Sequence, residues 1–413
     1  MATVLSNAAG PVSAASPQSG RAERIISIDV LRGLVMVIMA LDHTRVFFTS
    51  VRFEPENILR TWPMLFYTRW ITHFCAPMFF FLAGTGAFLY RNRTGSVGKV
   101  SRFLWTRGVW LIILEWTIID FSWTFVPWQF GGVIWSLGCG MVILAALVWL
   151  PESVILGLGV LVISLHDLFD AVKPAQLGSL KWLWVLLHRR GVIPDTHFFV
   201  LFPLVPWFAV MAVGYVFGRL LLRDAQRRQR AIIALGAALT FTFLALRLFN
   251  VYGNPTAGIA GSTPGAWHRL PSLAMTIVYF LDVEKYPPSL QFLLMTIGPS
   301  LILLGLLDKI SEYSDLGRLL RALLVFGRVP LFFYILHLYL IHFLAIATAY
   351  LFHQPVDWLW HGGFFMNQTP DGYGHGLPFV YAVWALAVVL LYFPCRWFAD
   401  LKTRKRTWWL SYL

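Results

Sequence analysis

Long apolar runs, each bounded by polar or basic residues, follow one another along almost the whole chain. A run of roughly 18 or more apolar residues is long enough for a helix that crosses a bilayer. The pattern predicts about ten such helices, with approximate ranges 26–48, 69–90, 103–122, 131–150, 153–171, 200–222, 230–250, 289–307, 327–350 and 377–398. The expected fold class is therefore all-α, a polytopic transmembrane helix bundle.

Composition supports a membrane protein and excludes a soluble domain. Of 413 residues, 58% are hydrophobic and only 13% are charged, and the mean hydropathy is +0.67. The net charge of +13 could suggest nucleic acid, but the basic residues concentrate in alternate connections between the apolar runs, which is the positive-inside pattern. We expect lipid rather than nucleic acid as a partner, and both termini in the cytoplasm. Loop 172–199, with four basic residues on the outer side, is the exception.

Three segments make up the expected domain organisation. Residues 1–23, rich in Ala, Ser, Gly and Pro, are typical of a disordered cytoplasmic leader. Residues 24–398 form one membrane domain, and residues 399–413 a basic cytoplasmic tail. The first apolar run is too long and too charged for a cleavable signal. The three cysteines are scattered along the chain, so they give neither a disulfide framework nor a zinc-binding pattern. We expect no bound metal.

Four ionisable residues of the first expected span are candidates for a functional site. A helix advances about 100° and 1.5 Å per residue, so Arg32 and His43 lie on one face, three turns and roughly 16 Å apart. Asp29 shares that face by its i,i+3 spacing, whereas Asp42 points about 80° away. Because ionisable side chains facing lipid are costly, such residues usually mark a functional site.

Three further histidines of the expected spans are candidates for the site. His73 lies near the outer start of the second span, so an antiparallel pair of helices would bring it to the depth of His43, where the two could meet or face one cavity. His337 and His342 are five residues apart, about 140° around a helix, so they cannot both face one small site. We expect His337 to line the pocket. Helix packing through a hydrogen bond is the alternative for each.

Two acidic positions have less specific interpretations. Glu115 lies deep in the third span, where an unpaired carboxylate should be neutral or paired. Arg107 and Arg32 are its expected partners, and a structural ion pair is as good an explanation as catalysis. His166 and Asp167 end the fifth span and are expected to be interfacial.

Other motifs concern helix packing and the outer face. Gly214 and Gly218, four residues apart, permit close helix contact. The apolar run 273–281 is too short to span and is expected to be interfacial or re-entrant. Lys285 introduces the eighth span from outside, where it could snorkel or bind an anionic group.

The motifs together resemble a known family. IDVLRG followed at a distance by His43, then THFCAPMFFFLAG, PLVPWFAVMAVGYVFGR, KYPPSLQFLLMTIGP and GRVPLFFYILHLYLIH, closely resemble the bacterial DUF1624 membrane proteins. These are grouped with the catalytic domain of heparan-alpha-glucosaminide N-acetyltransferase, in a wider transmembrane acyltransferase superfamily that includes the acyltransferase-3 proteins. The resemblance runs from about residue 24 to 398.

The resemblance implies an enzyme of the bacterial cytoplasmic (inner) membrane. It would pass an acyl group, commonly acetyl from cytosolic acetyl-CoA, to a sugar or glycan on the far side. The Arg and His spacing looks like the paired functional residues of acyltransferase-3 proteins, which map onto Arg32 and His43. The eukaryotic branch has its implicated histidine in the loop after the first span; loop 49–68 contains none, so His43, together with His73, would have to serve.

The residues fit this chemistry. Arg32, paired with Asp29, would bind CoA phosphates, and His43 would act as general base or as nucleophile of an acetyl-imidazole intermediate. Asp42 or another carboxylate would orient His43. The direct and covalent routes both stay open, as does assembly into a homo-oligomer. A transporter or flippase, or a non-catalytic membrane scaffold, is the alternative function.

Overall fold

The computed structural model describes residues 25–254, 266–309, 317–362 and 369–405, with residues 407 and 410. The expected leader 1–23 lies outside the described residues. Of the expected tail, the residues up to Arg404 continue the last helix.

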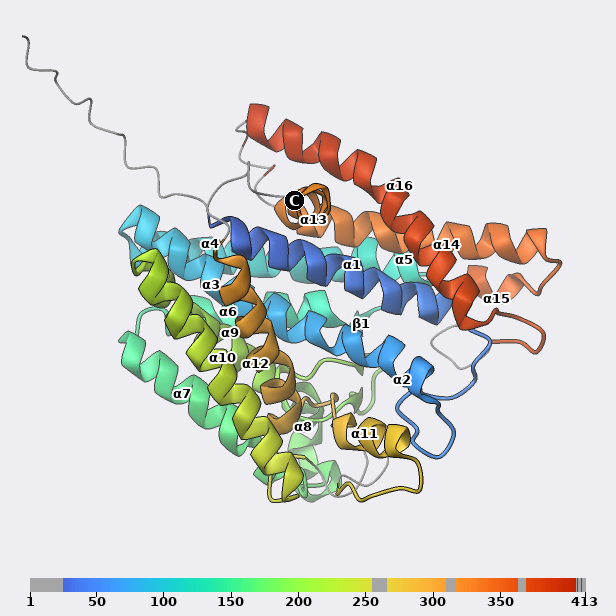
Figure 1. The fold of residues 1–413 in the computed structure, drawn as a ribbon, viewed down its shortest axis with the longest axis horizontal. Coiled ribbons are helices and arrows are strands. Elements are labelled where there is room, and N and C mark those ends of the chain that lie inside the picture. Colours follow the sequence, from blue (N-terminus) through green and yellow to red (C-terminus); the bar gives the residue numbers. More distant parts are fainter. Residues whose placement is uncertain are drawn as a thin grey trace, which may run out of the picture.

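Helices form almost the entire described structure (Figure 1). The longer helices are α1 (Ile26–Phe48), α3 (Cys75–Thr94), α4 (Val97–Leu114), α6 (Val133–Leu147), α7 (Glu152–Leu165), α9 (Leu204–Phe217), α10 (Ala225–Leu248), α12 (Leu290–Leu307), α13 (Arg318–Arg328), α14 (Pro330–Leu351) and α16 (Leu377–Arg404). The shorter α-helices are α2 (Pro63–Trp70), α5 (Asp120–Thr124), α8 (Lys181–Leu187), α11 (Leu273–Leu281) and α15 (Asp357–Trp360). Short helical segments of other type are the 3-10 helices η1 (Ile71–Phe74), η3 (His166–Phe169), η4 (Pro174–Leu180) and η5 (Gly218–Leu222), and the π-helix η2 (Glu115–Ile119).

Every expected span coincides with a helical segment, and the protein is an integral membrane protein. Seven segments in the described part are long and apolar enough to cross a bilayer: Pro63–Thr94, Glu152–Phe169, Leu204–Leu222, Ala225–Leu248, Leu290–Leu307, Pro330–Leu351 and Leu377–Arg404. The other three expected spans are α1, which carries several charges, α4 with its continuation to Thr124, and the shorter α6. A total of about ten spans and the cytoplasmic termini remain predictions.

Helix α1 lies at the centre of the bundle. It packs against α3 and α12 on one side and against α13, α14 and α16 on the other (Figure 1). The arrangement buries even polar side chains of α1, Asp29 and Arg45 among them. Charged residues of this helix therefore face protein rather than lipid, as intramembrane charge requires.

Small residues let helices approach closely at two contacts. A Cβ on Gly33 would lie 1.8 Å from the Leu323 carbonyl oxygen, so α1 and α13 touch through their backbones. A Cβ on Gly214 would lie 2.2 Å from the Phe81 carbonyl oxygen, and one on Gly218 would meet Phe88 at 2.6 Å. The close contact predicted for Gly214 of α9 and Gly218 at the start of η5 is confirmed.

One end of the bundle collects the loops, the short helices and a small sheet. Strands β1 (Phe130–Gly131), β3 (Phe199–Val200) and β2 (Gly191–Val192) lie in the order β1-β3-β2, with β1 parallel and β2 antiparallel to β3. The short apolar run 273–281 forms helix α11. Buried Arg247 holds its end, because the guanidinium donates to the carbonyls of Tyr279, Phe280 and Asp282. These contacts fix the segment that leads to Lys285 and α12.

Candidate functional site

Two histidines from distant parts of the chain form a hydrogen-bonded pair. His43 of α1 and His337 of α14 approach within 2.6 Å, Nδ1 to Nε2. His337 is fully buried, and its Nδ1 lies 3.1 Å from the Phe333 carbonyl oxygen one turn earlier. The rings stack at a centroid distance of 4.9 Å. The structure thus brings the expected pocket residue His337 directly to His43.

Aromatic side chains surround this pair. The Trp123 ring lies edge-on to His43 at 4.8 Å and the Tyr334 ring at 6.2 Å. Trp123 comes from α5 and is 9% exposed, and Tyr334 precedes His337 on α14. Such rings hold the imidazole in place sterically and keep the local dielectric low, which strengthens the hydrogen bond between the histidines.

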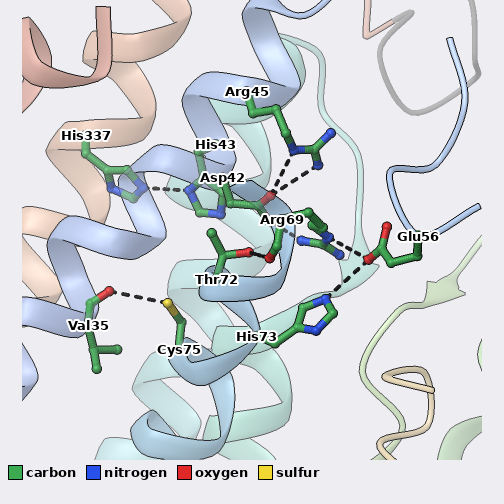
Figure 2. A network of polar contacts seen from close by, with 10 residues as sticks. All are labelled: Val35, Asp42, His43, Arg45, Glu56, Arg69, Thr72, His73, Cys75 and His337. Atoms are coloured by element: carbon green, nitrogen blue, oxygen red, sulfur yellow. Dashed lines mark hydrogen bonds and ion pairs between the residues drawn. The ribbon is translucent and has the colours of Figure 1, made fainter. Parts of the chain in front are cut away.

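A chain of ion pairs runs from α1 to the start of the second span (Figure 2). Asp42 Oδ1 accepts from Arg45 Nε and Nη2 at 3.2 and 3.1 Å, and its Oδ2 accepts from Arg69 Nη1. Arg69 Nε donates to Glu56 Oε1 at 2.8 Å, and this oxygen also lies 3.3 Å from His73 Nε2. All five side chains are at most 17% exposed. Asp42 therefore binds arginines, and the side chain hydrogen-bonded to His43 is His337.

Glu56 organises the outer part of this chain. The residue lies in the loop before α2 (Pro63–Trp70), and burial opposes its ionisation. The Arg69 guanidinium and the hydrogen bond from His73 outweigh burial and hold the pKa of this carboxyl well below its usual range. His73 lies in η1, is 1% exposed and packs on the Phe292 ring at 5.3 Å. No hydrogen bond joins His73 to His43 in the described structure.

The inner residues of the α1 stripe lie where the helix rule placed them. Arg32 Nη1 lies 3.0 Å from Asp29 Oδ1 and donates to the Gly327 carbonyl of α13 at 3.3 Å. The Arg32 side chain is 24% exposed, so the guanidinium is not sealed inside the bundle. The pairing with Asp29 matches the expected i,i+3 contact.

The remaining histidine of α14 holds helices together. His342 is fully buried, with Nδ1 2.9 Å from the Ser122 carbonyl oxygen and Nε2 2.9 Å from that of Leu359. Its ring stacks on Phe125 at 4.1 Å. His342 thus bridges α5 and α15 away from the His43 pair, as the angle between the two α14 histidines requires.

Glu115 does not pair with either expected arginine. Its carboxylate faces the backbone N–H groups of Ile134 and Trp135 in the first turn of α6, where the helix dipole favours negative charge. Oε2 is buried with no hydrogen-bond partner in the described part of the chain. The π-helix η2 begins at Glu115, and such turns often mark functional segments.

The start of η3, which follows α7, is more than interfacial. His166 is 3% exposed, and its Nε2 lies 2.9 Å from the Pro288 carbonyl oxygen and 3.1 Å from Asp167 Oδ1. Asp167 Oδ2 accepts from the Leu290 N–H at the start of α12. These contacts tie α7 to the segment before α12.

Sequence patterns did not single out three members of the ion-pair chain, Arg45, Arg69 and Glu56. A signal existed for Arg69, which precedes His73 by one helical turn at the start of an apolar run. Arg45 follows Asp42 at i+3 and could have been paired with it. Glu56 gave no signal, because its partner is distant in the sequence.

No group of three or more His, Cys, Asp or Glu residues that could hold a metal ion occurs in the described ranges. The absence of a metal remains a prediction from the sequence.

Comparison with known proteins identifies the family. A family model described as "Heparan-alpha-glucosaminide N-acetyltransferase, catalytic" matches residues 24–248. The matched part contains Arg32, His43, Glu56 and His73, whereas His337 lies beyond it. A search of curated proteins finds no match. Because the model covers more than half of the chain, the protein belongs to the heparan-alpha-glucosaminide N-acetyltransferase catalytic-domain family, a family of membrane acetyltransferases.

Proposed function

We propose that this protein transfers an acetyl group from cytosolic acetyl-CoA to a sugar or glycan on the non-cytoplasmic side of the bacterial inner membrane. The observation that carries the proposal is the hydrogen bond between His43 and His337. Family membership supports the reaction class, and the residues around His43 supply the groups that the reaction needs.

The hydrogen bonds fix which nitrogen of His43 is basic. A carbonyl oxygen only accepts, so His337 Nδ1 donates to Phe333. In a neutral His337 the other nitrogen, Nε2, is then an acceptor, and His43 Nδ1–H donates to it. A neutral His43 consequently keeps its lone pair on Nε2. This atom has no hydrogen-bond partner among the described residues. It is also not fully shielded from solvent, so an acceptor can reach it.

His43 Nε2 is thus oriented for acyl transfer. In the direct route it takes the proton of an acceptor hydroxyl or amine while the acceptor oxygen or nitrogen attacks the thioester carbon. The C–S bond breaks, and the CoA sulfur receives the proton from His43, which gives acetylated acceptor and CoA thiol. In the covalent route the same nitrogen attacks the carbonyl carbon first, the C–S bond breaks, and CoA leaves as its thiolate, which gives an acetyl-imidazole. The acceptor oxygen or nitrogen then attacks the acetyl carbon, the bond to His43 breaks, and the proton of the acceptor ends on the CoA sulfur. His337 is the positioning residue in both routes.

The donor side of the site lies at the other end of α1. Arg32 is on the face of His43, roughly 16 Å away along the helix axis, and its guanidinium is partly accessible. A guanidinium binds phosphate oxygens through charge-assisted hydrogen bonds. We assign Arg32, oriented by Asp29, to the CoA phosphates, so that the pantetheine arm extends along α1 toward His43.

Asp42 and His73 have supporting roles in this proposal. Both oxygens of Asp42 are bound to arginines, which leaves the carboxylate a poor proton acceptor. The chain from Asp42 to His73 ties α1 to η1 and to the outer loop. It holds His43 at a constant depth next to α14.

A direct assay tests the function. The purified protein is incubated with acetyl-labelled acetyl-CoA and a glycan mixture, and the products are separated into free acetate, labelled protein and labelled glycan. Labelled glycan supports the proposal, and labelled protein that is absent in His43→Ala supports the covalent route. Absence of both CoA binding and transfer would favour a transporter or a scaffold.

A further inference from the structure

Lys285 is a buried cation with no counter-ion among the residues that the structure describes. The residue is 8% exposed and lies in the segment that leads into α12. Its ammonium lies 5.2 Å from the centroid of the Tyr286 ring. Among the described residues, Nζ makes no hydrogen bond, and no carboxylate lies within 4.0 Å of it. An ammonium is expensive to bury without an anion, so the site lacks one partner.

The lysine belongs to the neighbourhood of the candidate catalytic residues. Its charge is close enough to act on Asp42, His43 and His73. Phe292 in the first turn of α12, shortly after Lys285, packs on the His73 ring. The ammonium therefore adds positive charge near the imidazole to which the proposal assigns the acetyl transfer.

The carboxylates nearby are already engaged. Asp42 is bound to two arginines, and Glu56 is bound to Arg69 and His73. Glu284, directly before Lys285, accepts the backbone N–H of Tyr286 at 3.0 Å. Within the described ranges, no carboxylate therefore contacts the Lys285 ammonium and neutralises its charge.

A second cation reaches the same tyrosine from another loop. The Arg190 guanidinium lies 5.3 Å from the Tyr286 ring centroid and 5.7 Å from that of Phe199 in β3. No carboxylate of the described residues lies within 4.0 Å of it. Arg190 belongs to loop 172–199, whose basic residues depart from the positive-inside pattern. A ligand on the outer face would explain why basic residues are kept there.

We propose that Lys285 and Arg190 form a subsite for an acidic group, carboxylate or phosphate, of the acyl acceptor. Both cations flank Tyr286, whose ring can also pack against a sugar. The inference rests on the proposed function for the identity of the ligand as acceptor. The donor phosphates are assigned to Arg32 at the opposite end of α1, so an anion at Lys285 enters from the other side. Lys285 is a specificity-determining residue in this proposal.

Binding of matched disaccharides to the full-length purified protein tests the subsite. The probes are cellobiose, cellobiouronic acid and cellobiose 6′-phosphate, which differ mainly in the acidic group. We expect the wild-type protein to bind at least one acidic probe roughly tenfold more tightly than cellobiose, since a charge-assisted hydrogen bond supplies about that factor. The preferred probe identifies carboxylate or phosphate as the recognised group.

Three variants complete the test. Lys285→Gln should lose most of the preference, measured as the ratio of the affinity for the acidic probe to that for cellobiose in the same variant, and Lys285→Arg should keep it. Lys181→Gln is the matched control, because this half-exposed lysine has its own counter-ion, Asp195, at 3.7 Å in loop 172–199. An equal affinity of the wild-type protein for all three probes, or an unchanged preference in Lys285→Gln, would overturn the subsite. Failure of the proposed function would show separately, as a lack of labelled acetyl transfer by the wild-type protein.

Discussion

His43 on α1 and His337 on α14 are hydrogen-bonded at 2.6 Å although 294 positions separate them in the sequence. The bond leaves the other ring nitrogen of His43, Nε2, with a free lone pair. The proposed acetyl transfer depends on this nitrogen. His43→Ala should lower acetyl transfer by about a hundredfold to ten-thousandfold, the usual contribution of a general base. Transfer and acetyl-CoA affinity are measured on the same preparation. Unchanged transfer would remove His43 from the mechanism.

His337 should act through His43. His337→Phe removes the acceptor for the His43 Nδ1–H, and we expect kcat to fall at least roughly tenfold with little change in acceptor KM. His337→Gln, whose amide oxygen can accept the same hydrogen bond, should recover part of the loss. The measurement is kcat and acceptor KM of both variants in steady-state kinetics. Equal activity of the two variants would contradict a positioning role.

Arg32→Ala should impair the use of acetyl-CoA in particular. S-acetylpantetheine carries the same thioester without phosphates, so its use should be unaffected by a lost phosphate contact. We expect the ratio of kcat/KM for acetyl-CoA to that for S-acetylpantetheine to fall about tenfold. If both donors lose activity equally, the arginine serves the α1–α13 contact through Gly327 and not the donor.

Glu56→Gln should reduce stability most at neutral pH. Burial raises the pKa of the Glu56 carboxyl, but the Arg69 guanidinium and His73 lower it by more, so the pKa is lowered in the folded protein. Such a carboxyl stabilises the fold above its ordinary pKa, and the contribution is lost as the pH falls through the lowered value. We expect a loss of about 2 kcal/mol at neutral pH.

Thermal unfolding of the wild-type protein and Glu56→Gln, at about pH 7 and at about pH 4, provides the measurement. The difference in Tm should be smaller at the acidic pH. Glu54→Gln is the control, because Glu54 is exposed in the same loop. A Tm difference that grows on acidification would refute the ion pair.

Gly214→Ala should weaken the contact between α3 and α9. The added Cβ would lie 2.2 Å from the Phe81 carbonyl oxygen, so the helices must separate. We expect a loss of about 1 to 3 kcal/mol, as for other overpacked sites. Gly86→Ala on α3 is the matched control, since its Cβ would meet no atom within 4 Å. Thermal unfolding in detergent measures both, and equal Tm values would contradict the contact.

The sequence by itself determined the membrane class, the helical ranges and the charged stripe on α1. The length of an apolar run determines where a helix can cross the bilayer. In lipid the backbone N–H and C=O groups have no water to bind, so they must be hydrogen-bonded within the helix itself. Helical periodicity alone placed Asp29 against Arg32 and separated His337 from His342. These are local relations within one helix.

Only the tertiary structure decided which distant residues meet. Periodicity says nothing about which helix faces α1, so the pairing of His43 with His337 and the approach of Glu56 to Arg69 followed from packing. The same holds for Asp42, whose arginine partners leave the orienting position to His337. The free nitrogen of His43 and the uncompensated charge of Lys285 depend on three-dimensional neighbours, because a hydrogen bond or an ion pair forms only between groups in contact.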